Sequence, residues 1–195
     1  MICRKSDAES ALIAADYLRR GKVVVLPTDT VYGFSGMVDG RHYSFHTDEE
    51  IRRIKGRGEE KPFIQLIAAP QDLKKYTRDL VPAEILAKWP GPLTVVVHTF
   101  LKDGDITTTA FRCPNDEWLR RVIELCGAPI FSTSVNRTGA PVLDNVQDIK
   151  NEFGNDVALI VDDGSKRGNI PSTIVKIEED GTVTLVRQGA VTIAC

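Results

Sequence analysis

The chain has 195 residues, of which 42% are hydrophobic and 27% charged, and its formal net charge is −2 at pH 7. This composition is ordinary for a globular protein and lacks the bulk positive charge of most nucleic-acid-binding proteins. We expect no membrane span because no apolar run approaches about 18 residues. The length favours one domain over residues 1–195, and four widely spaced cysteines favour a reducing, cytoplasmic compartment.

The first predicted elements are a helix and a buried strand. Ser6 and Glu9 have the spacing of a capping box, apolar residues follow at helical spacing, and Gly21 marks a helix end. Four consecutive apolar residues at 23–26 are typical of a strand that is covered on both faces. Pro27 ends this strand because it has no N–H to donate to a neighbour.

The rest of the chain alternates between helical and extended patterns, with a loop predicted over residues 34–47. Asn115 is expected to cap a helix, and Asp180-Gly181 is a hairpin signal. Further helices are predicted at 48–55, from Pro70, at 82–88, from Asn115 to Gly127 and at 146–153. Further strands are predicted at 63–68, 93–99, 106–112, 129–132, 157–161, 174–177 and 182–186. The pattern therefore predicts an α/β (α+β-like) domain around a twisted sheet of mixed parallel and antiparallel strands.

Four hydrogen-bonding side chains follow the first strand: Thr28, Asp29, Thr30 and Tyr32. Ligands of open α/β sheets bind where strands end, so this cluster is a candidate binding site. An ordinary polar turn is the alternative. The sequence holds neither a P-loop nor a dinucleotide-binding glycine pattern.

Two pairs of polar residues have spacings that suit anion binding. Lys55 and Arg57 lie at a predicted helix end, where an arginine can bind phosphate with two hydrogen bonds and a lysine adds a point charge. Ser134 and Asn136 point to one side of an extended backbone. The alternatives are a solvated helix face for the first pair and a turn for the second.

Six segments occur in the order in which they are found in one known family. They are PTDTVYG (27–33), KGR with KPFI (55–57 and 61–64), WPGPLT (89–94), SVN with Gly139 (134–139), PSTIV (171–175) and RQG (187–189). Together they resemble the YrdC/TsaC family, the threonylcarbamoyl-AMP synthases. The chain resembles the short, single-domain form of that family, and the resemblance implies a concave basic groove.

The resemblance also implies a reaction and a set of site residues. The family converts L-threonine, bicarbonate and ATP into threonylcarbamoyl-AMP and pyrophosphate, for the threonylcarbamoyladenosine modification of tRNA. Mg²⁺ is expected to accompany ATP. The implied catalytic residues are Lys55, Arg57, Ser134 and Asn136. The implied ATP-binding residues are these four with Lys61, Thr108 and Arg187. The implied threonine-binding residues are Thr28, Tyr32, Arg112 and Ser172.

The chain departs from the family pattern at three positions. Leu66 stands where longer members often have histidine, Asp144 where threonine is usual, and Gly58 where proline is usual. Asp144 would repel phosphates unless Mg²⁺ bridged them or the side chain turned away.

Two other functions remain open at this point. One is a YciO-like paralogue with another substrate, and the other is an RNA-binding module of the same fold without ATP chemistry. Arg52, Arg53, Lys55, Arg57 and Lys61 lie close together in the sequence and suit either RNA or a nucleotide. The expected partners are the small substrates, the machinery that transfers threonylcarbamoyl to tRNA, and, as an open question, tRNA or double-stranded RNA itself. No membrane partner is expected.

Overall fold

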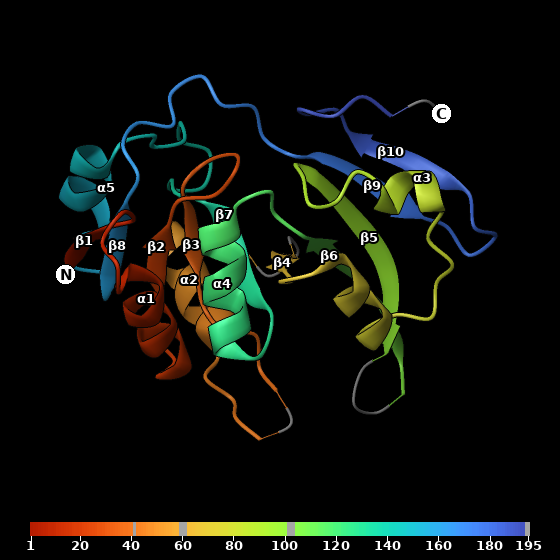
Figure 1. Cartoon of the computed structure of the whole chain (residues 1–195), viewed down its shortest axis with the longest axis horizontal. Coiled ribbons are helices and arrows are strands. Elements are labelled where there is room, and N and C mark those ends of the chain that lie inside the picture. Colours follow the sequence, from red (N-terminus) through yellow and green to blue (C-terminus); the bar gives the residue numbers. More distant parts are fainter. Residues whose placement is uncertain (41, 59–61, 101–103, 194–195) are drawn as a thin grey trace.

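The computed structural model describes residues 1–40, 42–58, 62–100 and 104–193, and its strands form one sheet (Figure 1). The strands are β1 (Ile2–Arg4), β2 (Val24–Leu26), β3 (Gly33–Ser35), β4 (Ile64–Leu66), β5 (Leu93–Phe100), β6 (Ile106–Arg112), β7 (Ile130–Ser134), β8 (Leu159–Asp162), β9 (Thr173–Ile177) and β10 (Val183–Arg187). The helices are α1 (Ser10–Arg19), α2 (Thr47–Lys55), α3 (Ala83–Leu86), α4 (Glu117–Cys126) and α5 (Val146–Phe153), with a 3₁₀ helix η1 (Pro70–Lys75).

The strand order across the sheet is β1-β8-β2-β3-β7-β4-β6-β5-β9-β10. The pairs β1–β8, β2–β8, β4–β6 and β5–β9 are parallel, and the others are antiparallel. The predicted α/β class with a mixed sheet is therefore confirmed. None of the helices in the described part of the chain is long and apolar enough to cross a membrane.

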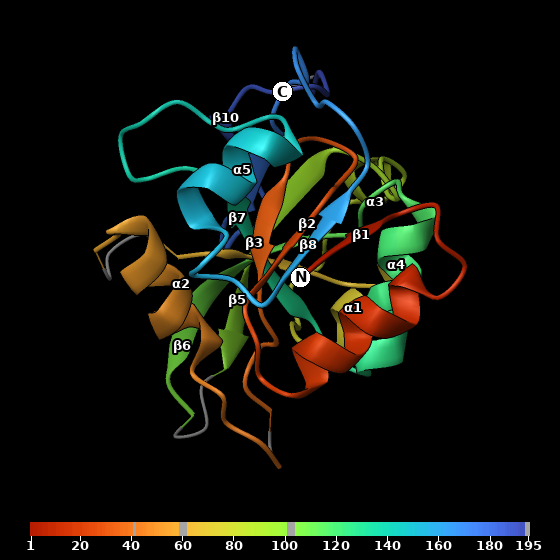
Figure 2. The same cartoon turned by 90° about the vertical axis from the view of Figure 1, so that its left-hand side faces the viewer.

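The half of the sheet formed by β1, β8, β2, β3 and β7 is covered on both faces. Figure 2 shows α1 and α4 on one side of these strands and α2 and α5 on the other. Val24 and Leu26 pack into the cluster beneath α1 and α4, whereas Val25 packs into the cluster beneath α2 and α5. This double coverage explains why β2 reads as a continuous apolar run.

The other half, formed by β5, β6, β9 and β10, has its own core. Val95, Val97, Phe111 and Val175 pack there with residues of η1 and α3. β4 and β6 run parallel to one another at the junction of the two halves, and β4 also pairs with β7. The junction thus joins segments that are far apart in the sequence, and the candidate site lies there.

Some sequence predictions at element boundaries are wrong. The proposed capping box does not form, because α1 begins at Ser10 and no side chain caps it. Asp7 instead accepts a hydrogen bond from the backbone N–H of Arg4 at 2.9 Å. The N-cap of α4 is Asp116 and not Asn115, and β1 and β3 lie where no strand was predicted. Each of these strands has three residues and pairs with distant segments.

Candidate active site

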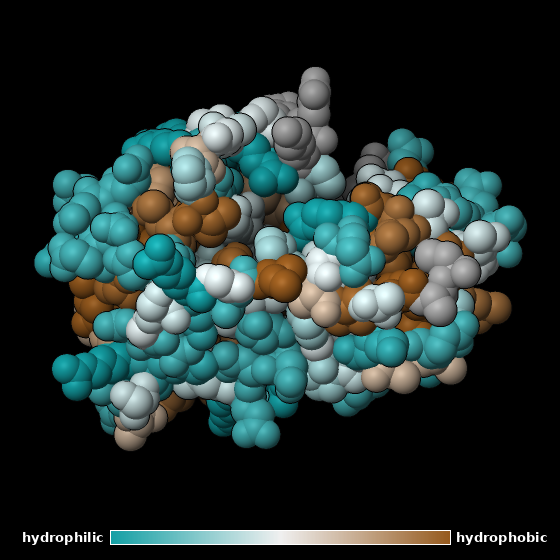
Figure 3. All heavy atoms as spheres, turned by 90° about the horizontal axis from the view of Figure 1, so that it is seen from above, coloured by the Kyte–Doolittle hydropathy of each residue, from teal (hydrophilic) through white to brown (hydrophobic). Residues whose placement is uncertain are grey.

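A cavity of about 310 Å³ lies at the junction of the two halves, which falls in the size range of ligand pockets. Its walls come from the turn after β2, from β3, β4 and β7, and from the segments around β9 and β10. Figure 3 looks onto this side of the molecule and shows hydrophobic residues on both halves. The lining residues are Thr28, Thr30, Val31, Tyr32, Gly33, Arg57, Pro62, Phe63, Ile64, Arg112, Ser132, Thr133, Ser134, Val142, Pro171, Ser172, Ile174 and Arg187.

The charge in this cavity is of one sign. Arg57, Arg112 and Arg187 contribute three guanidinium groups, and the described lining residues include no carboxylate. Burial lowers the pKa of each of these arginines. An anionic ligand would relieve this unfavourable burial of positive charge. The cavity therefore suits an anion that offers oxygen acceptors.

The turn after β2 is fixed by its own side chains. The Thr28 hydroxyl donates to the carbonyl of Val31 at 2.7 Å and accepts from the backbone N–H of Thr30 at 3.0 Å. It also lies 2.9 Å from the Thr30 hydroxyl. Thr28 thus lines the cavity, but its hydroxyl is already used within the turn.

Tyr32 is fully buried and connects this turn to the segment after β8. Its hydroxyl donates to the carbonyl of Gly164 at 2.7 Å and accepts from the N–H of Asp163 at 2.8 Å. Burial raises the pKa of Tyr32 to about 12, so the phenol stays neutral. Asn169, in the same segment, donates to the carbonyl of Thr30 at 2.6 Å. Tyr32 lines the cavity, and its hydroxyl ties the end of the turn after β2 to Asp163 and Gly164.

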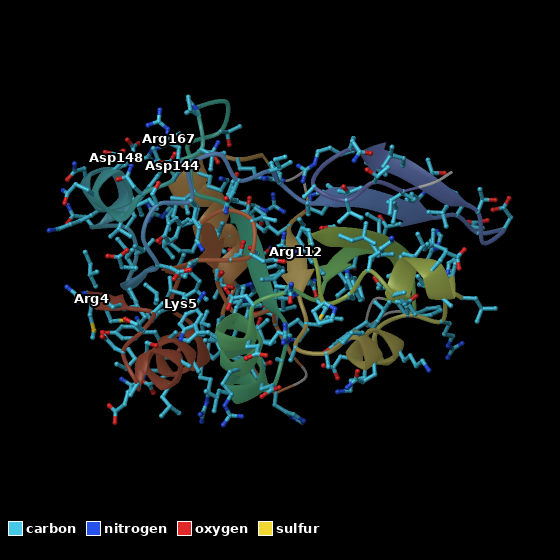
Figure 4. All side chains as sticks on the ribbon, turned by 45° about the horizontal axis from the view of Figure 1, so that its top comes forward. Arg4, Lys5, Arg112, Asp144, Asp148 and Arg167 are labelled. Atoms are coloured by element: carbon cyan, nitrogen blue, oxygen red, sulfur yellow. The ribbon has the colours of Figure 1, made fainter. Side chains whose placement is uncertain are left out.

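Arg112 lies on the floor of the cavity at the end of β6, and Figure 4 places it at the centre of the molecule. Its side chain is 4% exposed. Nη1 donates to the Thr30 hydroxyl at 3.1 Å, and Nη2 lies 3.5 Å from Oδ1 of Asp29. The buried Nε has no hydrogen-bond partner among the described residues. Arg112 therefore keeps one buried N–H donor without a described acceptor.

Ser172 and Arg187 form the opposite wall. The guanidinium of Arg187 donates to the carbonyl of Ser172, from Nη2 at 2.8 Å and from Nε at 3.3 Å. The hydroxyl of Ser172 lies 2.9 Å from that of Thr94 on β5. The two residues that the sequence assigned to different substrates thus lie side by side.

Lys55, Ser134 and Asn136 form a tight cluster at the end of α2. The Lys55 ammonium donates to the carbonyls of Ser134 and Asn136 and to Oδ1 of Asn136, the last two at 2.9 Å. The Ser134 hydroxyl donates to the same Oδ1 at 2.7 Å. Burial, with a smaller effect from Arg57, lowers the pKa of Lys55 to about 8. All three N–H groups of Lys55 have acceptors, so Lys55 holds the loop after β7 in place.

A second cavity of about 180 Å³ adjoins this cluster. It is lined by Lys55, Arg57, Ser134, Asn136, Thr138 and Gly139. Arg57 also lines the larger cavity, where its Nη2 donates to the carbonyl of Pro62 at 3.1 Å and its guanidinium stacks on Phe63. Arg57 and Ser134 line both cavities.

Three residues of interest line neither cavity. Thr108 is exposed on β6 and lines neither cavity, although it is on the same face as Arg112. Leu66 is buried in the core beneath α1 and α4. Asp144 lies with Asp148 and Arg167, away from Arg112 (Figure 4), and does not line either cavity. Lys61 lies outside the described residues.

Several lining residues escaped sequence reasoning. Thr133 and Ser132 lie on β7, and only the pairing of β7 with β3 and β4 brings them to the cavity. Within residues 1–40, 42–58, 62–100 and 104–193, no group of three or more metal-binding side chains could hold an ion.

Comparison with known proteins gives consistent matches. The family model Sua5_yciO_yrdC, described as telomere recombination, matches residues 16–189. A threonylcarbamoyl-AMP synthase of Pyrococcus abyssi is 33% identical over 178 residues, which is 86% of this chain and 50% of that protein. One of Photobacterium profundum is 29% identical over 182 residues, covering 88% of this chain and 95% of that protein. The chain thus spans half of the first relative and nearly all of the second.

The solved structures agree with these matches. The crystal structure of P. abyssi Sua5 complexed with L-threonine has a TM-score of 0.82 and 31% identity, covering 97% of this chain and 57% of that one. E. coli YciO has a TM-score of 0.78 at 22% identity, covering 97% of this chain and 93% of its own, which shows a shared fold. Since the family model extends over most of the chain, from residue 16 to residue 189, the chain belongs to the Sua5/YciO/YrdC family.

Proposed function

We propose that this chain is a threonylcarbamoyl-AMP synthase, a nucleotidyltransferase that joins L-threonine, bicarbonate and ATP. The observation that carries the proposal is the cavity with three arginines and no described carboxylate, in a chain whose relatives have this activity. The proposal treats residues 1–195 as one domain, because a single sheet runs through both halves.

The two ends of the site suit different parts of the substrates. Arg112 suits the carboxylate of threonine, because an arginine edge can make two parallel hydrogen bonds to it. Thr28 and Tyr32 are proposed to shape this end of the pocket around the amino acid. Ser172 is proposed to contact the same substrate from the opposite wall.

The other end suits the triphosphate. Arg57 lines both cavities and can stabilise the negative charge that develops as pyrophosphate leaves. Lys55 fixes the loop that carries Ser134 and Asn136, and its charge lies beside the smaller cavity. Arg187, which lies beside Ser172, is proposed to contact the nucleotide where the two substrates meet. Thr108 and Lys61 remain proposed ATP contacts, and Thr108 would require the nucleotide to extend beyond the larger cavity along β6.

The proposed reaction has two steps. The amino nitrogen of threonine takes up the carbon of bicarbonate and water is lost, giving a carbamate. A carbamate oxygen then forms a bond to the α-phosphorus, the bond from this phosphorus to the bridging oxygen breaks, and pyrophosphate leaves with its electron pair. Positioning and electrostatic stabilisation suffice for such a transfer, and no covalent enzyme intermediate is needed. Mg²⁺ bound with ATP would offset phosphate charge.

The downstream role is proposed on the same basis. The product would supply threonylcarbamoyl to the enzymes that modify tRNA, in a reducing, cytoplasmic compartment. The described cysteines Cys3, Cys113 and Cys126 are free, which is consistent with that compartment. Direct binding of tRNA would use the arginines around the end of α2, of which Arg53 is exposed and Arg52 and Arg57 are half-buried.

The test is release of pyrophosphate from ATP, measured with each of L-threonine and bicarbonate present or absent. The proposal predicts release only when both are present. Release that is indifferent to threonine would favour a paralogue with another acceptor. Absence of nucleotide binding, with salt-dependent RNA binding instead, would favour the RNA-binding module.

A further inference from the structure

Asp29 follows β2 and uses its two carboxylate oxygens differently. Oδ2 accepts a hydrogen bond from the backbone N–H of Asn115 at 2.9 Å. Oδ1 is buried, lacks a hydrogen-bond partner among the described residues, and lies 3.5 Å from Nη2 of Arg112. The Asp29 side chain is 7% exposed. One oxygen thus holds the chain that follows β6, and the other faces a buried cation.

Arg112 needs this anion because a guanidinium stays charged in proteins. Burial lowers the pKa of Arg112, and the charge of Asp29 acts in the opposite direction. The other described cation that affects Arg112 is Arg187, which repels it. Removing one member of a buried ion pair leaves an uncompensated charge, which moves toward water or another acceptor.

The pair is also incomplete as a hydrogen-bonded unit. Nη1 of Arg112 donates to the hydroxyl of Thr30, Nη2 faces Asp29 beyond hydrogen-bonding distance, and Nε has no described partner. The Nε edge of an arginine is one of the edges that binds a carboxylate with two hydrogen bonds. Asp29 and Thr30 thus contact the two terminal nitrogens, and Nε is the donor of the guanidinium that has no described partner.

We propose that Asp29 is a positioning residue for Arg112: it orients and charge-balances the guanidinium so that the unpaired Nε can donate to the carboxylate of the amino-acid substrate. The inference rests on the proposed function, because it assigns Arg112 to the amino acid. It predicts that Asp29 governs recognition of the carboxylate without contacting the substrate. Binding of the nucleotide, at the other end of the site, should not depend on it.

The experiment measures the affinity of L-threonine and of L-threoninamide, which lacks the carboxylate, by calorimetry on the full chain. The variant Asp29→Asn keeps an oxygen for the N–H of Asn115 and removes the charge. We expect its dissociation constant for threonine to rise about tenfold, as for a lost interaction of a charged group. Its affinity for a non-hydrolysable ATP analogue should stay within about twofold of that of the unaltered protein, a difference smaller than the loss of one hydrogen bond would cause.

Two further variants separate positioning from a purely structural role. Arg112→Lys should weaken threonine binding by itself, and adding Asp29→Asn to it should weaken binding no further, because the two residues act as a unit. If Asp29→Asn does not fold, Asp29→Glu provides the test: its longer side chain displaces the guanidinium, so threonine affinity should fall while ATP-analogue affinity holds. Asp79→Asn is the matched control, since Asp79 also pairs with a side chain and a backbone N–H, at His98.

The outcomes distinguish this inference from the proposed function. Loss of discrimination between threonine and threoninamide in the Asp29 variant supports the inference. Wild-type threonine affinity in a folded Asp29 variant, or equal loss of ATP-analogue binding, overturns it and leaves the proposed function standing. Failure of the unaltered protein to bind threonine overturns both.

Discussion

Replacing Lys55 by methionine is the sharpest test of how the site is built. Methionine has nearly the length of lysine and no charge. The change removes the donor that three acceptors share, namely the carbonyls of Ser134 and Asn136 and Oδ1 of Asn136. Oδ1 keeps its bond from the Ser134 hydroxyl, so two backbone carbonyls lose the ammonium.

The expected loss of stability follows from these two carbonyls. An acceptor left without its donor costs about 1–3 kcal/mol when it is buried. Removing the buried ammonium offsets part of this loss of stability, because burial disfavours its charge and lowers its pKa to about 8. We therefore expect the free energy of unfolding at pH 7 to fall by about 2–3 kcal/mol.

The assay combines urea unfolding with pyrophosphate release. Turnover should fall by about 10²–10³, the scale of losing one charged partner of the transition state. Lys150→Met is the control, because Lys150 is exposed on α5 and should lose neither stability nor activity. A Lys55 variant with the stability of the unaltered protein would refute the positioning role. If such a variant had nevertheless lost activity, Lys55 would act on the phosphates alone.

Four other predictions concern the same site. Arg57→Ala should lower turnover by about 10²–10³ because it removes a cation that lines both cavities, and an unchanged rate would remove it from the site. Arg112→Ala should mainly raise KM for threonine in steady-state assays; an effect on ATP alone would make its assignment wrong. Tyr32→Phe should lower the free energy of unfolding by about 1–2 kcal/mol, measured in urea, because the N–H and carbonyl that its hydroxyl bonds to lose a partner. Because the pKa of Lys55 is lowered to about 8, affinity for an ATP analogue should fall as pH rises through that value. Calorimetry should find this fall missing in Lys55→Met, and an identical pH profile in both proteins would contradict it.

Much of the fold could be predicted because its signals are local. The continuous apolar run at 23–26 indicated a strand covered on both faces, and α5 has the predicted bounds. The hairpin of β9 and β10 follows from Asp180-Gly181, where Gly181 has a φ of +84° that glycine adopts without strain.

The wrong predictions concern elements whose structure depends on contacts between distant segments of the chain. β1 is a three-residue strand that pairs in parallel with β8, more than a hundred residues away, and no local pattern marks it. Asn115 looks like a helix cap, but its N–H is bound by Asp29 and the cap is Asp116.

At the site, too, some features could be predicted from the sequence and others could not. Residue spacing and the family resemblance together identified the three arginines that line the cavity, Arg57 from both and Arg112 and Arg187 from the resemblance alone. They could not reveal that the hydroxyl of Thr28 and the ammonium of Lys55 are occupied within the protein, since those bonds depend on the three-dimensional path of the backbone. Thr108 shares a strand face with Arg112, yet β6 carries it beyond the cavity.

The central claim is that the cavity joins carboxylated threonine to AMP. The direct measurement is mass spectrometry of the reaction of the full chain with ATP, L-threonine and ¹³C-bicarbonate. The account predicts threonylcarbamoyl-AMP that carries the ¹³C label, formed together with pyrophosphate and absent when threonine is omitted. ATP consumption that yields no labelled adenylate would contradict the account.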